Sequence, residues 1–176
     1  MRLRSRILAG AVAVIAVQVL VVVALVERQL SSSLRTDAIA GLAREARVVG
    51  AHWTPGADAL ALAHTDGAAL GHRVTLIRPD GVVIGDSDFD QDGLRTLENH
   101  GTRPEIVTAR TAGLGVSTRR SPSRGDMEIY VAVGAALGFA RVSMSEFSLE
   151  SAITSAYRVL FIAGAISLIV ALIVAW

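Results

Sequence analysis

The sequence contains no cysteine among its 176 residues, which excludes disulfide bonds, thiol chemistry and thiolate metal sites. It also lacks a large charge excess, because the formal net charge is +1 and no basic stripe suited to a nucleic acid is present. A glycine-rich phosphate loop, a serine nucleophile elbow and an HExxH motif are absent as well. We therefore predict no catalytic residue in this chain, no cofactor and no nucleic-acid partner, and these absences disfavour a surface hydrolase.

The sequence does contain two long apolar runs, one near each end. Neither 7–26 nor 159–176 carries a charged residue, and each has about the length that crosses ~30 Å of hydrocarbon as a helix. We predict transmembrane helices over 7–26 and 158–176. The cytoplasmic N-terminus would then be 1–6, and an extracytoplasmic domain would occupy 27–157.

Arginines set the expected orientation. Arg2, Arg4 and Arg6 precede the first run, and basic residues mark the cytoplasmic side of a span. Both termini are therefore expected in the cytoplasm. A cleaved signal peptide is the alternative for the first run, but this run is longer than the usual ~7–15 apolar residues, and the cleavage spacing after Ala24 is poor.

The first half of the middle segment has helical periodicity. Apolar residues recur at helical spacing over 27–52, which predicts a helix that continues the first span outward. Thr54-Pro55-Gly56 breaks that helix. A second, weaker helix is expected over Ala57–Leu70.

The second half predicts strands. Arg73–Arg78 and Val82–Asp86 flank Pro79-Asp80-Gly81, which indicates a β-hairpin because proline presets φ and glycine accepts a positive φ. Thr102 and Glu105 have capping-box spacing and predict a short helix to about residue 112. Three more strands are expected at Gly115–Arg120, Met127–Val133 and Phe139–Met144, followed by a helix over Glu146–Tyr157. The predicted fold class is α+β: an antiparallel sheet of about five strands with a long N-terminal helix and with helices over one face.

Three stretches carry a family resemblance: RVTLIRPDGVVIGDSDFD from 73, LENHGTRPEI from 97 and MEIYVAVGAALGFARVSMS from 127. They resemble the extracytoplasmic PAS-like sensor domain of bacterial two-component sensor histidine kinases of the phosphate-regulon sensor type. The resemblance implies an input module that carries an extracytoplasmic signal across the bacterial inner membrane. The phosphoacceptor helix and ATP-binding domain of such kinases are absent from the sequence, so a histidine kinase would be a longer parent protein, and a response regulator would be reached only through that missing core.

Other classes of protein remain open at this point. The second choice is the input domain of a chemoreceptor or of a cyclic-dinucleotide enzyme. A plain membrane-anchored extracytoplasmic binding protein is a third possibility.

Two polar clusters offer candidate sites. His100, Arg119, Arg120 and Arg141 are candidate ligand-binding residues, because guanidinium groups bind carboxylates and phosphates and a histidine titrates near ~6.5. A surface or capping histidine and a solvated basic loop are the structural alternatives. Asp86, Asp88, Asp90 and Asp92 are candidate metal ligands, with part of the spacing of a calcium loop. The twelfth-position glutamate of such a loop is missing, which favours a solvated acidic loop.

The apolar runs also carry a packing pattern. Small residues that recur every fourth position let helices approach closely. The residues expected to pack in the membrane are Gln18, Ala163, Ser167, Ala171 and Ala175. We therefore expect a homodimer, with membrane lipid as the other partner.

Overall fold

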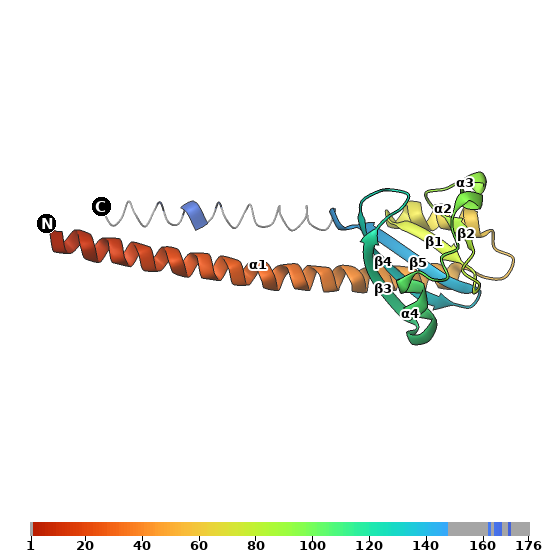
Figure 1. Cartoon of the computed structure of the whole chain (residues 1–176), viewed down its shortest axis with the longest axis horizontal. Coiled ribbons are helices and arrows are strands. Elements are labelled where there is room, and N and C mark those ends of the chain that lie inside the picture. Colours follow the sequence, from red (N-terminus) through yellow and green to blue (C-terminus); the bar gives the residue numbers. More distant parts are fainter. Residues whose placement is uncertain (1, 148–161, 163, 167–168, 170–176) are drawn as a thin grey trace. The chain divides into compact units, whose positions relative to one another are not determined.

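The computed structural model describes residues 2–147, 162, 164–166 and 169. The chain divides into two compact units, one of them Thr36–Ser148 and the other formed by the remaining residues. Helix α1 spans Arg2–His52 (Figure 1), so the predicted first span and the predicted helix over 27–52 form one continuous helix. No helix in the described part of the chain combines the length and apolar character of a membrane span. The predicted second span and most of the helix after Glu146 fall outside the described residues.

The unit Thr36–Ser148 is built around one sheet of five strands. Its strands have the order β2-β1-β5-β4-β3, and every neighbouring pair is antiparallel. The elements after α1 are α2 (Ala59–Leu70), β1 (Arg73–Ile77), β2 (Val83–Asp86), α3 (Gln91–Thr96), α4 (Pro104–Ala112), β3 (Leu114–Arg120), β4 (Met127–Ala135) and β5 (Gly138–Ser145). The α+β class and the predicted strands are confirmed, and β5 is the central strand.

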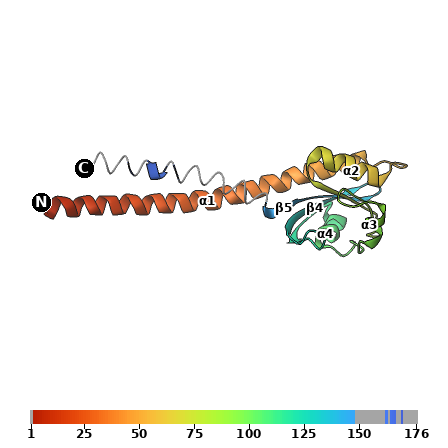
Figure 2. The ribbon, with the colours of Figure 1, turned by 90° about the horizontal axis from the view of Figure 1, so that it is seen from above.

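One face of the sheet is apolar and is covered by the N-terminal helices. Because side chains alternate along a strand, one face collects one set of residues. That set is Val74, Leu76, Ile129, Val131, Val133, Ala140 and Val142, each at most 3% exposed. Leu42, Ala46 and Val49 of α1 are buried as well, and Gly50 of α1 packs closely on Ala140. Figure 2 shows α2 on the side of the sheet opposite α3 and α4.

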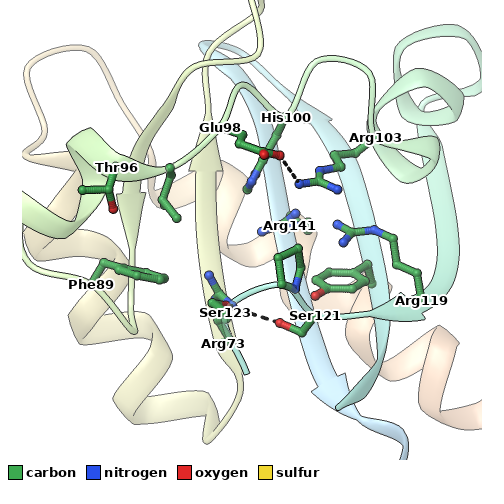
Figure 3. A pocket seen from close by; sticks show the side chains of 13 residues that line it. Arg73, Phe89, Thr96, Glu98, His100, Arg103, Arg119, Ser121, Ser123 and Arg141 are labelled. Atoms are coloured by element: carbon green, nitrogen blue, oxygen red, sulfur yellow. Dashed lines mark hydrogen bonds and ion pairs between the residues drawn. The ribbon is translucent and has the colours of Figure 1, made fainter. Parts of the chain in front are cut away.

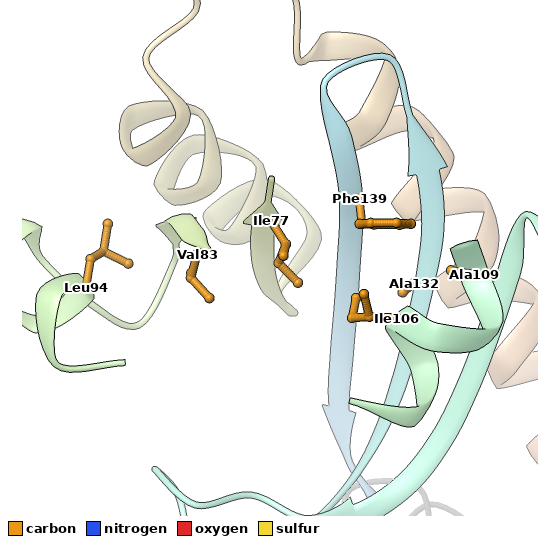
Figure 4. Close-up of a cluster of buried hydrophobic side chains, with 7 residues drawn as sticks. All are labelled: Ile77, Val83, Leu94, Ile106, Ala109, Ala132 and Phe139. Atoms are coloured by element: carbon orange, nitrogen blue, oxygen red, sulfur yellow. The ribbon is translucent and has the colours of Figure 1, made fainter. Parts of the chain in front are cut away.

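The opposite face is divided into an apolar half and a charged half. The apolar half is a buried cluster (Figure 4) made of Ile77, Val83, Leu94, Ile106, Ala109, Ala132 and Phe139. Leu94 comes from α3, and Ile106 and Ala109 come from α4. The expectation of helices over one face is therefore wrong. This half of the second face is also apolar, and α3 and α4 bury it.

Local chemistry explains where the short helices begin. Asp58 caps α2 by accepting from Leu60 N at 2.9 Å. Asp90 caps α3 in the same way, accepting from Gly93 N at 2.8 Å, and this six-residue helix was not predicted. The capping box at Thr102 is wrong, since α4 begins after Arg103 with Pro104 in its first turn and no side-chain cap. Glu105 is fully buried instead.

The predicted hairpin turn between β1 and β2 is confirmed. Gly81 has φ +88°, its N–H donates to Arg78 O at 2.9 Å, and its carbonyl accepts from His100 N at 2.8 Å. A Cβ at this position would collide with Asn99 and with the backbone of Gly101. The turn therefore fixes the loop that carries His100 as well as the hairpin.

Replacing Gly81 with alanine tests this turn. Gly56 is a matched control, because its φ is +87° but a Cβ there meets nothing within 4 Å. We expect Gly56→Ala to cost about 1 kcal/mol of backbone strain, and Gly81→Ala about 3 kcal/mol because the collision is added. Urea unfolding followed by fluorescence of the buried Trp53 in a Trp176→Phe background measures both. Equal losses for the two variants would contradict the turn's role in placing the His100 loop.

Candidate ligand-binding site

A cavity of about 300 Å³ lies on the charged half of the second face (Figure 3). Strands β1, β3, β4 and β5 supply its floor, while the end of α3 and the loops beside it supply its walls. Its lining residues are Arg73, Phe89, Thr96, Leu97, Glu98, His100, Arg103, Arg119, Ser121, Pro122, Ser123, Tyr130 and Arg141. Four of these are arginines.

Arg141 lies in the middle of the central strand and is 1% exposed. Its Nη1 donates to Glu105 Oε1 at 3.2 Å, and its Nη2 donates to Thr75 Oγ1 at 3.0 Å. The guanidinium also lies 4.9 Å from the centre of the Tyr130 ring. Burial lowers the pKa of Arg141 even though the charge of Glu105 raises it. The free-energy cost of removing this guanidinium from water is therefore larger than the stabilisation that the nearby carboxylates provide.

Glu105 from α4 is the carboxylate that holds two arginines in place. Oε1 accepts from Arg141 and also from Arg119 Nη2 at 2.8 Å, while Oε2 accepts from Ser117 Oγ at 2.6 Å. Burial raises the pKa of Glu105, but the hydrogen bonds and the charges of the two arginines outweigh it and hold that pKa at about 2. Glu105 is therefore ionised throughout the physiological range.

His100 is buried at the rim of the same cavity, with 6% exposure. Burial and the positive charges of Arg141, Arg103 and Arg119 lower its pKa to about 3. The ring is therefore neutral at physiological pH, and the alternative of a surface histidine is wrong. Its Nδ1 has no hydrogen-bond partner among the residues that the structure describes.

Arg119 and Arg120 are adjacent but belong to different faces of β3. Arg119 lies over the Tyr130 ring at 4.0 Å and lines the cavity. Arg120 is exposed and donates to the carbonyl of Gly125 in its own loop. The structure thus brings His100, Arg119 and Arg141 together, and it leaves Arg120 outside.

The four aspartates of the predicted acidic cluster make different contacts, although Asp86 and Asp88 share Arg73. Asp86 is fully buried and accepts from Arg73 Nε at 2.9 Å, so the expectation of a solvated loop is wrong for this residue. Asp88 pairs with Arg124 at 2.7 Å and Asp92 with Arg95 at 3.0 Å, while Asp90 caps α3. No group of three or more potential metal ligands lies together within the described ranges.

The predicted membrane-packing residues fall mostly outside the described part of the chain. Gln18 is exposed on α1. The positions 163, 167, 171 and 175 are not described. Packing between membrane helices therefore stays a prediction.

Sequence reasoning missed two of the cavity arginines, together with the aromatic ring and the carboxylate that contact the other two. Arg73, Arg103 and Tyr130 line the cavity, and Glu105 anchors it from behind. The available signal for Arg73 was a charged residue at the start of a strand that is otherwise mostly apolar.

No protein-family model matches the chain, and no curated protein matches it in sequence. Among solved structures, it is similar to the ligand-binding domain of the Campylobacter jejuni chemoreceptor Tlp3, solved in complex with 4-methylisoleucine. The TM-score is 0.57 at 11% sequence identity, and the match covers 70% of this chain. The chain spans 57% of that chain's length. The likeness concerns the fold alone and agrees with the PAS-like fold predicted from the sequence.

The Glu105 network predicts a specific dependence of stability on pH. Folding lowers the pKa of Glu105 from 4.5 to about 2. The ionised carboxylate therefore contributes its full stabilisation of the fold at pH values above 4.5, and this contribution is lost as the pH falls toward about 2. The stability difference between wild type and Glu105→Gln should shrink by about 2 kcal/mol between about pH 6 and about pH 3. Urea unfolding at the two pH values measures it.

Glu98→Gln is the control for that experiment, because Glu98 is 82% exposed in its pair with Arg103. Its stability difference from wild type should change little with pH, as expected for a surface ion pair. A difference for Glu105→Gln that stays constant from about pH 6 to about pH 3 would show that Glu105 is not held ionised by these arginines.

Proposed function

We propose that this chain is the sensory input module of a membrane-bound bacterial signalling protein, and that it binds a small molecule in the cavity lined by Arg141. The observation that carries the proposal is the cavity itself, an open space with buried charged groups at the centre of a domain. Buried charges are costly and are found mainly where function requires them. The volume of about 300 Å³ is at the small end of ligand pockets, which favours a small metabolite.

Strand β5 links the cavity to the N-terminal helix. Arg141 lies on the cavity side of β5, and the next residue toward the N-terminus, Ala140, packs on Gly50 of α1 on the other side. A shift of β5 on ligand binding would therefore reach α1 directly. Small displacements of packed helices are a known means of transmitting a signal.

Membrane anchoring is part of the proposal and is supported by the sequence. The uncharged run 7–26 with arginines before it favours a first span with a cytoplasmic N-terminus. The uncharged run at the C-terminus favours a second span. The domain would then face the extracytoplasmic side of the inner membrane, in a homodimer packed through its membrane helices.

The output domain has two candidates. The sequence resembles sensor histidine kinases of the phosphate-regulon type. The similar solved domain belongs to a chemoreceptor, and that alternative fits the fold at least as well. Both place an extracytoplasmic sensor before a cytoplasmic signalling region, so the same input mechanism serves either.

A chimera tests the proposal. Residues 1–176 are joined to the cytoplasmic half of a chemoreceptor or histidine kinase with a measurable output, and cells are exposed to amino acids, organic acids and phosphate. Thr96 is an exposed cavity residue whose Oγ1 donates only to its own helix, to Gly93 O at 2.7 Å. Thr96→Trp should therefore fill the cavity mouth and raise the half-maximal ligand concentration at least about tenfold.

Thr111 provides the matched control. It is also exposed and also donates to a carbonyl three residues earlier, Thr108 O at 3.2 Å, but it does not line the cavity. Thr111→Trp should respond like wild type. If Thr96→Trp responded to every stimulus as Thr111→Trp does, the cavity would not be the sensory site.

A further inference from the structure

Most of the charged groups that line the cavity are hydrogen-bond donors. Four guanidinium groups line it, and Glu98 is its sole acidic residue. That carboxylate already pairs with Arg103 at 3.1 Å and is 82% exposed at the rim. The buried carboxylates that balance the other arginines, Glu105 and Asp86, lie behind the guanidinium groups and not in the cavity wall.

Positive charges outnumber negative charges among the residues that line the cavity. Arg119 and Arg141 share the single carboxylate of Glu105. Three arginine charges lower the pKa of His100, and the opposing effect of Glu105 is smaller. A negatively charged group in the cavity would relieve this repulsion, because it would supply the counter-charge that the wall lacks.

Two buried polar atoms of the lining residues lack partners in the part of the chain that the structure describes. They are Nε of Arg141 and Nδ1 of His100, and both residues are more than nine-tenths buried. Arg141 Nε is a donor, and the neutral imidazole donates when Nδ1 carries the proton. A buried donor without an acceptor costs free energy, and both atoms lie beneath the cavity surface, so a ligand oxygen would reach them after a small movement of the side chains.

An ammonium group, by contrast, would find no buried carboxylate in the wall of this cavity. A zwitterionic amino acid needs an acceptor for its amine, and the single lining carboxylate is the exposed Glu98. The Tyr130 ring is already occupied by two guanidinium groups, Arg119 at 4.0 Å and Arg141 at 4.9 Å from its centre. A cationic amine would therefore meet repulsion from several arginines.

Part of the wall is apolar. Phe89, Leu97 and Pro122 line the cavity beside the arginines. A short carbon skeleton would bury apolar surface there, which inorganic phosphate cannot do.

We infer that the ligand is a small organic anion without an amine, such as a short carboxylic acid, with its carboxylate bound by Arg103, Arg119 and Arg141 beside His100. This inference rests on the proposed function, since it specifies the occupant of the same cavity. It separates this chain from the similar chemoreceptor domain, whose solved complex contains an amino-acid derivative.

Calorimetry on the full chain in detergent micelles tests the inference, with succinate, citrate and pyruvate as organic anions. Inorganic phosphate, L-leucine and glycerol are the comparison compounds. At least one organic anion should bind, and L-leucine and glycerol should not. Phosphate should bind more weakly than the best organic anion or not at all.

Matched arginine variants locate the binding. Arg103→Gln removes a cavity guanidinium whose ion pair is with the exposed Glu98, so the buried network stays intact. It should weaken binding of the anion at least about tenfold. Arg120→Gln removes the exposed arginine on the other face of β3 and should bind the anion like wild type.

The outcomes separate the two proposals. Suppose that L-leucine or glycerol binds, that Thr96→Trp abolishes this binding, and that no organic anion binds. This result overturns the anion inference and leaves the cavity as the sensory site. Failure of all three organic anions to bind also overturns it. Anion binding that is unaffected by both Arg103→Gln and Thr96→Trp places the anion outside the cavity and overturns the inference too.

Discussion

The buried guanidinium of Arg141 is the constraint on which the rest of this domain depends. A charge in the middle of the central strand of a sheet is unfavourable unless counter-charges and hydrogen bonds reach it. Glu105 and Thr75 provide them, at 3.2 Å and 3.0 Å. Because Glu105 lies on α4, this requirement also fixes where α4 sits on the sheet, alongside the apolar contacts of Ile106.

Strand β5 contributes apolar residues to one face of the sheet and a cavity-lining arginine to the other. On one side it carries Ala140 and Val142, which are fully buried on the face that α1 covers. On the other side it carries Arg141 in the cavity wall. A well-packed apolar face transmits displacement because it has few voids into which it can relax. A ligand that pulls on Arg141 therefore acts on the same strand that supports the N-terminal helix.

The elements that depend on local sequence were predictable, and those that depend on distant partners were not. The hairpin at Gly81 and the three later strands follow from alternation and from turn residues. Helix α3 was missed because its cap, Asp90, was assigned to an acidic loop. His100, Arg119 and Arg141 were predicted as candidate ligand residues, but alternation along β3 excludes Arg120 from the cavity. The role of Glu105 was missed, because its ion pair with Arg141 joins residues 36 positions apart and depends on the strand order.

The most direct measurement of the central claim is the NMR signal of the Arg141 Nε–H group in the full chain, recorded with and without saturating organic anion. The signal is identified by its loss in Arg141→Lys, and the Arg120 signal, identified in the same way, serves as the reference. The account predicts that the Arg141 Nε–H signal shifts when the anion is bound, because a carboxylate beside this cavity-lining guanidinium changes its electrostatic environment, while the Arg120 signal stays unchanged. An Arg141 signal that does not move at saturation would contradict the claim that this buried guanidinium receives the ligand.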